Sequence, residues 1–217
     1  MRRLEFAAAA IGGVLLAAVL VYADVPSSTP SDIKQPSVEY AAGLASQAIV
    51  SSDVDGDGKM DLVVANNESD DVSVLYGKGD GTFEDAVSIA VLFGPSAVQV
   101  GDMNNDGRLD IVVAHDFESV VATLLQFAPR EFDLEEAQTV GDGPLGLALA
   151  DYNRDGDLDA TTANNFDVSG TVSYLRGLGD GTFATAVQIV VGDDTEPFAL
   201  VAADVNVRRI GKERDRL

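Results

Sequence analysis

The sequence predicts an all-β protein built from β-propeller blades of four antiparallel strands. An acidic motif, D-x-[DN]-x-D-G-x-x-D, occurs three times, at 53–61, 102–110 and 151–159, so its first Asp recurs every 49 residues. Each copy is followed by apolar runs of strand length rather than helix length. Four short strands within about 40 to 50 residues, repeated along the chain, are typical of a propeller blade.

The first repeat shows the order of these strands. Its acidic loop leads into an apolar run at 62–65, a polar turn, and a second run at 72–76. The turn GKGDGTF (77–83) and the run AVSIAV follow, and the alternation of that run indicates a strand with one wetter face. A Gly-Pro loop then leads into SAVQVGD, which delivers the next acidic loop. The third repeat matches this order, and FALVAAD is predicted to open a fourth.

The N-terminal residues predict export from the cytoplasm. Residues 1–23 combine Met1-Arg2-Arg3, an apolar stretch at 6–22 and small residues before Asp24, which is typical of a signal peptide cleaved after Ala23. The apolar stretch leaves an uncleaved membrane anchor as the alternative. Residues 24–40 form a Pro- and Ser-rich linker, and 41–217 form the repeat segment. Both alternatives predict a secreted or cell-surface protein.

Composition limits the class of partner. The 217 residues include 36 acidic and 14 basic side chains, for a net charge of −22. A field of that sign repels phosphate backbones, so we expect no nucleic-acid partner. There is no cysteine, so any additional stabilisation comes from metal or packing and not from disulfides.

The acidic motif predicts a cation site. Carboxylates or amides at positions 1, 3, 5 and 9 and a carbonyl at position 7 supply the oxygen ligands that Ca²⁺ prefers. For a single copy, a solvated acidic turn is an equal alternative. An EF-hand is excluded because position 12 is Val64, Val113 or Thr162 and not Glu. The period of 49 residues excludes the short glycine-rich calcium repeats of secreted toxins.

The motif, the run LVVANN or IVVAHD after it, and the GDGTF turn resemble the FG-GAP repeats of the integrin α-subunit propeller and the related VCBS repeats of secreted bacterial proteins. The resemblance covers about residues 41–206. It implies three calcium sites with side-chain ligands at positions 1, 3, 5 and 9 and a backbone carbonyl ligand at position 7. These ligands are Asp53, Asp55, Asp57, Lys59 and Asp61; Asp102, Asn104, Asp106, Arg108 and Asp110; and Asp151, Asn153, Asp155, Asp157 and Asp159.

The repeats span approximately 43–91, 92–140 and 141–192, with a partial fourth at 193–217. The second repeat has FAPREF in place of the glycine-rich turn, so we expect its outer hairpin to turn differently. The fourth motif stops after Asp204 and Asn206, because Arg208 stands where the third ligand belongs. Three blades and a fragment make an incomplete propeller. We favour truncation of a longer protein; the alternative is that chains associate to complete the ring.

The sequence favours a binding module over an enzyme. The one histidine, His115, stands where the other repeats have Asn66 and Asn164 and is interpreted as a loop substitution. The leading hypothesis is an exported, calcium-stabilised, non-catalytic module for adhesion or for binding protein or glycan. The alternatives are an accessory module of, or fragment from, a larger extracellular hydrolase or lyase, and a fragment without activity of its own. Because loop 53–61 is the most acidic copy, we expect it to bind calcium most tightly.

Overall fold

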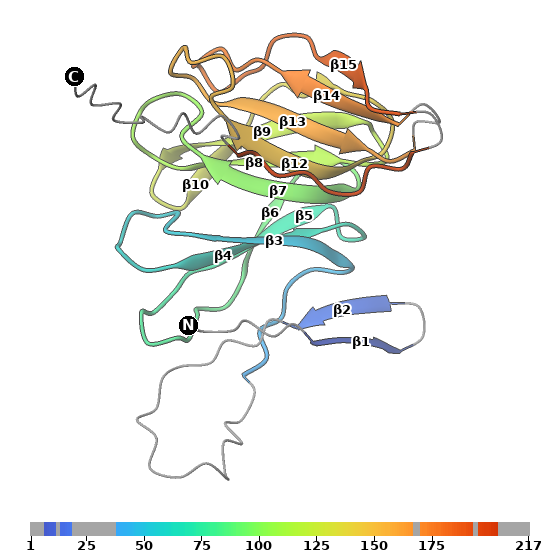
Figure 1. Ribbon diagram of the computed structural model, residues 1–217. Coiled ribbons are helices and arrows are strands. Elements are labelled where there is room, and N and C mark those ends of the chain that lie inside the picture. Colours follow the sequence, from blue (N-terminus) through green and yellow to red (C-terminus); the bar gives the residue numbers. More distant parts are fainter. Residues whose placement is uncertain (1–6, 12–13, 19–37, 167–169, 193–194, 204–217) are drawn as a thin grey trace, which may run out of the picture.

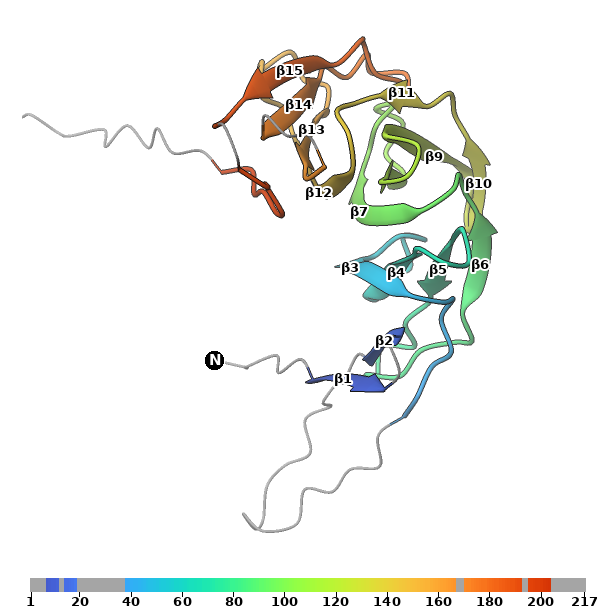
Figure 2. The ribbon, with the colours of Figure 1, turned by 90° about the vertical axis from the view of Figure 1, so that its right-hand side faces the viewer.

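The computed structural model describes residues 7–11, 14–18, 38–166, 170–192 and 195–203. All helical or strand structure in these residues is β-strand, which confirms the all-β prediction. Three antiparallel sheets follow one another around an arc, and their first strands, β3, β7 and β12, lie along its concave side (Figure 2). The outermost strands lie on the convex side. This is the arrangement of propeller blades.

Blades 1 and 3 have the same topology. Blade 1 has the strand order β3-β4-β5-β6, and blade 3 has the order β12-β13-β14-β15. The strands of blade 1 are β3 (Ser46–Ser52), β4 (Asp61–Asn66), β5 (Asp71–Leu75) and β6 (Val87–Ala90). Those of blade 3 are β12 (Pro144–Ala150), β13 (Asp159–Asn164), β14 (Thr171–Leu175) and β15 (Val187–Val190). The prediction of four strands per period is confirmed in both.

Blade 2 differs at its outer edge, as the FAPREF segment predicts. It contains β7 (Pro95–Gly101), β8 (Asp110–His115), β9 (Val120–Ala128), β10 (Glu131–Leu134) and β11 (Gln138–Thr139). Strands β10 and β11 both pair with β9, at different points along it, so the outer strand of this blade is split in two. In blades 1 and 3 the corresponding turn closes with a single bridge instead, Gly77 to Phe83 and Gly177 to Phe183.

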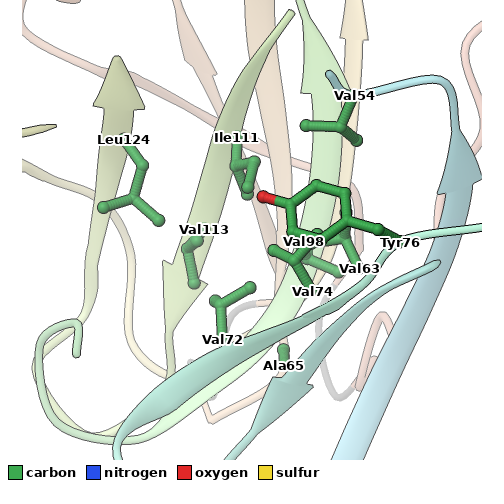
Figure 3. Packing of buried hydrophobic residues seen from close by; sticks show 10 residues of the cluster. All are labelled: Val54, Val63, Ala65, Val72, Val74, Tyr76, Val98, Ile111, Val113 and Leu124. Atoms are coloured by element: carbon green, nitrogen blue, oxygen red, sulfur yellow. The ribbon is translucent and has the colours of Figure 1, made fainter. Parts of the chain in front are cut away.

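The core lies between the blades. Figure 3 shows Val72 and Tyr76 of blade 1 facing Val113 and Ile111 of blade 2, and these side chains belong to one buried cluster. A second cluster joins blade 2 to blade 3 through residues that include Val112. Because each blade buries its apolar faces against its neighbours, the arc is held together mainly by hydrophobic burial.

Blade 3 has no fourth blade packed against it among the described residues. Ile89 of blade 1 packs against the cluster between blades 1 and 2, whereas Ile189, its counterpart in blade 3, is 50% exposed. Residues 195–203 contain no strand, so the strand predicted in FALVAAD is not formed there. They lie beside β12 instead: a Cβ built on Gly146 would be 3.1 Å from the Ala199 Cα. The rest of the partial fourth repeat, 204–217, lies outside the described residues.

The N-terminal part is described only in pieces. Strands β1 (Ala7–Ile11) and β2 (Val14–Ala18) pair as an antiparallel hairpin within the segment predicted to be the export signal. The remainder of that segment and the linker up to residue 37 lie outside the described residues. Over the described part of the chain, no helix has the length and apolar character to cross a membrane. Export remains a prediction.

The interpretation of His115 as a loop substitution is wrong. His115 is the last residue of β8, pairs with Pro95 and Val120 on the neighbouring strands, and is completely buried. Burial lowers its pKa from 6.5 to about 4, against the opposing influence of the Leu92 and Phe93 backbone and of the Asp70 carboxylate. The folded protein therefore holds a neutral imidazole at neutral pH.

This histidine should make the fold sensitive to acid. Between pH 6.5 and about 4 the unfolded chain protonates His115 and the folded chain does not, so stability is lost as the pH falls through this window. We expect a loss of about 3 kcal/mol from this residue. In His115→Asn, which carries the residue of repeats one and three, the free energy of unfolding measured in urea should fall less over the same window. An identical pH dependence in both chains would contradict the assignment.

Candidate metal centres

The three acidic loops occupy equivalent places in the three blades. Loop 1 (53–61) joins β3 to β4, loop 2 (102–110) joins β7 to β8, and loop 3 (151–159) joins β12 to β13. All three lie at the same end of the sheets (Figure 1). Each loop is closed at its base by a strand pair, Ser52 with Asp61 in the first. The predicted placement between the first and second strands of each blade is confirmed.

Glycine is favoured at position 6 because the backbone there has a positive φ angle, and not because a side chain would clash with neighbouring atoms. Gly58, Gly107 and Gly156 have φ angles of 86°, 85° and 98°. A Cβ added at any of them would meet no atom within 4 Å, so only the left-handed conformation disfavours a side chain. Position 4 is also left-handed, and there Arg154 has a φ of 65°.

Backbone amides fix the carboxylates and amides at positions 1, 3 and 5. The Asp at position 1 accepts a hydrogen bond from the glycine N–H at position 6 in all three loops, at 2.9, 2.9 and 3.1 Å. The oxygen of position 3, from Asp55, Asn104 or Asn153, accepts the N–H of position 5. The oxygen of position 5, from Asp57, Asp106 or Asp155, accepts the N–H of position 7, which follows the left-handed glycine. The sequence thus builds the same oxygen-rich frame three times.

The Asp at position 9 has a structural role that the sequence analysis missed. Asp61, Asp110 and Asp159 are at most 1% exposed. Each accepts the N–H of position 2 and a second N–H from the start of the outer turn or from β9, and so ties the loop to the third strand of its blade. The second donors are Gly77, Gln126 and Gly177, at 2.8, 2.8 and 2.9 Å. The sequence feature that could have indicated this role is that the Asp at position 9 directly precedes an apolar run of strand length.

Burial and local donors give these carboxyls different acidities. Burial raises the pKa of Asp61 and Asp110, although each accepts two backbone hydrogen bonds that oppose the shift. The backbone N–H of Arg108 lowers the pKa of Asp106, and the Lys59 ammonium lowers the pKa of Asp57. Position 5 is therefore held ionised in loops 1 and 2, whereas Asp61 and Asp110 carry a charge that their buried surroundings disfavour.

Loop 1 gathers three carboxylates. One oxygen from each of Asp53, Asp55 and Asp61 lies within 4.8 Å of the other two. Asp53 Oδ1 is buried and has no hydrogen-bond partner among the described residues. A buried carboxylate oxygen without a donor is costly, and a bound cation would satisfy it. The fourth carboxylate, Asp57, instead lies 2.6 Å from the Lys59 ammonium.

In loops 2 and 3 the residue at position 3 is Asn, and its side-chain amide donates a hydrogen bond to the carboxylate at position 5. The Asn104 side-chain amide donates to Asp106 at 3.0 Å, and the Asn153 amide donates to Asp155 at 2.8 Å. Arg108 forms an ion pair with Asp106. Asp157 at position 7 of loop 3 accepts a 2.8 Å hydrogen bond from Asn105 of loop 2, so these two loops are directly linked. The side chains at position 7 thus contact neighbours, which leaves the predicted ligand role to their carbonyls.

Loops 1 and 2 are also fastened to the following blade, which the repeat pattern does not reveal. The carbonyl of Val54 accepts a hydrogen bond from Gln126 Nε2 at 3.1 Å, and the carbonyl of Met103 accepts one from Gly181 N at 3.0 Å. Val54 and Met103 are consequently buried, whereas Tyr152 at the same position in loop 3 is 42% exposed. A following blade therefore covers position 2 where one is present.

The chain was compared with curated proteins and with solved structures. A search of curated proteins finds no match. Among solved structures, a protein from Lactobacillus plantarum aligns with a TM-score of 0.47 and 13% identity over 73% of this chain. The structure of BBS1N in complex with ARL6DN aligns with a TM-score of 0.37 and 14% identity over 75% of this chain. This chain spans 45% and 60% of the lengths of those two chains.

A comparison with models of protein families identifies the repeat in part of the chain. The model described as the FG-GAP-like repeat matches residues 53–113. That segment begins at the first acidic loop, includes blade 1 from β4 onward, and ends in β8 after the second loop. It therefore contains two copies of the acidic frame in their structural register. The resemblance predicted from the motifs is confirmed for residues 53–113, which match the FG-GAP-like repeat model.

Proposed function

We propose that this chain is an exported, calcium-binding β-propeller repeat module that binds another protein or a glycan and has no catalytic role. Calcium is its structural cofactor, with one ion in each acidic loop. The observation that best supports this proposal is that the same loop geometry occurs three times. In each loop, backbone amides orient the side-chain oxygens of positions 1, 3 and 5. Oxygen ligands on a tight loop are the donor set that Ca²⁺ prefers.

The electrostatics of loop 1 support the cation. Three carboxylates lie close together there, and Asp53 Oδ1 lacks a hydrogen-bond donor. Like charges at such distances repel, and the repulsion is strongest where water is excluded. An ion with two positive charges converts that repulsion into attraction. The residues present in the loop therefore fit calcium.

Calorimetric titration of the full chain with Ca²⁺ tests this proposal. We expect three ions per chain, with much weaker binding of Mg²⁺, because Mg²⁺ demands a rigid octahedral site and keeps its waters. The absence of binding at millimolar Ca²⁺ would overturn the calcium assignment. A stoichiometry of one would restrict it to a single loop.

The end of the sheets opposite the metal loops carries the surface that best fits a partner. Phe93, Phe117 and Phe166 are 52%, 59% and 57% exposed there, on loops and turns between strands. Phe93 and Phe117 stack with ring centroids 5.0 Å apart. Phe117 and Phe166 lie over the left-handed Gly94 and Gly143, which leave room for the rings. Exposed, contiguous aromatic side chains are typical of interaction sites.

The charge distribution favours a basic protein over a glycan. Glu68, Glu118 and Asp142 are exposed on the loops and turns of the same end of the sheets. Within the described residues, every Lys and Arg lies at the metal-loop end, namely Lys59, Lys78, Arg108, Arg130, Arg154 and Arg176. An end of the molecule that carries exposed aromatic rings and carboxylates but no basic side chain among the described residues attracts Arg and Lys side chains through both cation–π and ionic contacts.

A labelled nona-arginine peptide tests this face. Because the chain carries a net charge of −22, some binding of any polycation is expected at low salt, so the comparison is made near 0.15 M salt. We expect the double variant Phe93→Ala/Phe117→Ala, which changes no charge, to weaken binding about tenfold in fluorescence polarisation. The control is Phe127→Ala, since Phe127 is 52% exposed but lies on β9 near the metal loops. Equal weakening by both variants would contradict the proposal.

The absence of a catalytic role is supported by the position of the histidine. His115 is completely buried, so its imidazole does not meet solvent or a substrate. We therefore assign it to packing.

A further inference from the structure

We propose that Arg130 is a built-in counter-cation of loop 1, which calcium must displace from Asp55 before it can bind there. The inference rests on the proposed calcium function and adds to it a control of one site by the neighbouring blade. Arg130 lies in the turn between β9 and β10 of blade 2, whereas Asp55 belongs to blade 1.

The geometry shows a clamp between the two blades. Arg130 Nε and Nη2 both lie 2.7 Å from Asp55 Oδ2, and Nη1 lies 3.0 Å from Glu84 Oε2. The guanidinium carbon lies 3.9 Å from the centroid of the Tyr76 ring, over its face. All three partners belong to blade 1 or its outer turn. A planar guanidinium that makes two ionic contacts and one cation–π contact is held in a single orientation.

The clamp arises from two departures from the repeat. In loops 2 and 3 position 3 is Asn, whose amide donates to the Asp at position 5. In loop 1 position 3 is Asp55, whose side chain has no N–H group to donate. The FAPREF turn of the second repeat contains Arg130, which donates a hydrogen bond to Asp55. The corresponding turn of blade 3 offers loop 2 only the backbone N–H of Gly181. Among the described residues, loop 1 is therefore the acidic loop to which a neighbouring blade provides a cation.

The clamp competes with calcium for the same carboxylate. The Asp55 side chain is only 6% exposed, and one of its oxygens belongs to the group that it forms with Asp53 and Asp61. Calcium coordinated there would meet the Arg130 charge directly, so the guanidinium must withdraw from Asp55, and the cost of breaking that contact weakens calcium binding. We infer that loop 1 is the weakest of the three sites, which reverses the order expected from its number of carboxylates.

Binding at loop 1 should also loosen the contact between blades 1 and 2. When calcium takes Asp55, Arg130 keeps only the exposed Glu84 and the Tyr76 ring. Calcium at this site is thus coupled to the blade interface, whereas calcium at loops 2 and 3 is not coupled through Arg130.

Calorimetric titration of Arg130→Gln against the unchanged chain tests the inference. In the unchanged chain we expect two tighter sites and one weaker site. In Arg130→Gln the weaker site should tighten about tenfold, because a charge-assisted contact to a buried carboxylate no longer competes, and the other two should stay unchanged. The control is Lys78→Gln, which removes the same charge from the exposed turn of blade 1 without touching Asp55 and should leave all three affinities unchanged.

A second measurement needs no variant. The side-chain Nε–Hε resonance of Arg130 should be protected from solvent exchange without calcium and should lose that protection as the weakest site fills. Protection that persists at saturating calcium would overturn the inference, as would an unchanged or weakened third site in Arg130→Gln. Failure of the unchanged chain to bind any calcium would instead overturn the proposed function, so the two failures are distinguishable.

Discussion

Removing calcium is expected to lower the free energy of unfolding by about 8 kcal/mol when the ion is present at about 100 times its dissociation constant at three sites. Each ion that binds only the folded chain contributes about 2.7 kcal/mol under those conditions. The physical reason is the repulsion among carboxylates such as Asp53, Asp55 and Asp61, which calcium reverses. Urea unfolding in millimolar calcium and in excess chelator measures the difference.

The control for this experiment is magnesium at the same ionic strength, which separates specific binding from screening. We expect magnesium to restore only a small part of the stability. If chelator leaves the urea midpoint unchanged, the loops are stable acidic turns and calcium is not their cofactor.

The second large effect is expected at position 9. Asp110→Ala should lower the free energy of unfolding by about 2 to 6 kcal/mol even in chelator, because it leaves the N–H groups of Met103 and Gln126 buried without an acceptor. Urea unfolding without calcium measures this cost apart from any loss of metal binding.

The matched control is Asp106→Ala in the same loop. Asp106 is exposed, and its contacts are confined to loop 2. In chelator this variant should unfold close to the unchanged chain. If Asp106→Ala and Asp110→Ala are equally destabilising without calcium, position 9 has no special structural role.

Much of the fold followed from the spacing of a few residues. The recurrence of Asp53, Asp102 and Asp151 every 49 residues located three blades, and the runs of strand length between them located the four strands of blades 1 and 3. The FAPREF segment correctly indicated a different outer turn in blade 2. These features are local, so a single sequence contains them.

Contacts between blades could not be predicted in the same way. Arg130 and Asp55 are 75 positions apart, and neither residue type by itself indicates a partner. His115 was placed in a loop because the runs around it ended earlier in the sequence pattern than in the structure. The double hydrogen bonding of Asp110 depends on the third strand of its blade and not on the motif. Such roles arise from tertiary packing.

That each acidic loop holds one calcium ion is tested most directly by calorimetric titration of Asp106→Ala beside the unchanged chain. Asp106 supplies an oxygen at position 5 of loop 2, and its removal leaves loops 1 and 3 intact. We expect the stoichiometry to fall from three ions per chain to two, while the fold measured in chelator is preserved. Three ions bound by the variant would contradict the assignment of loop 2 as a calcium site.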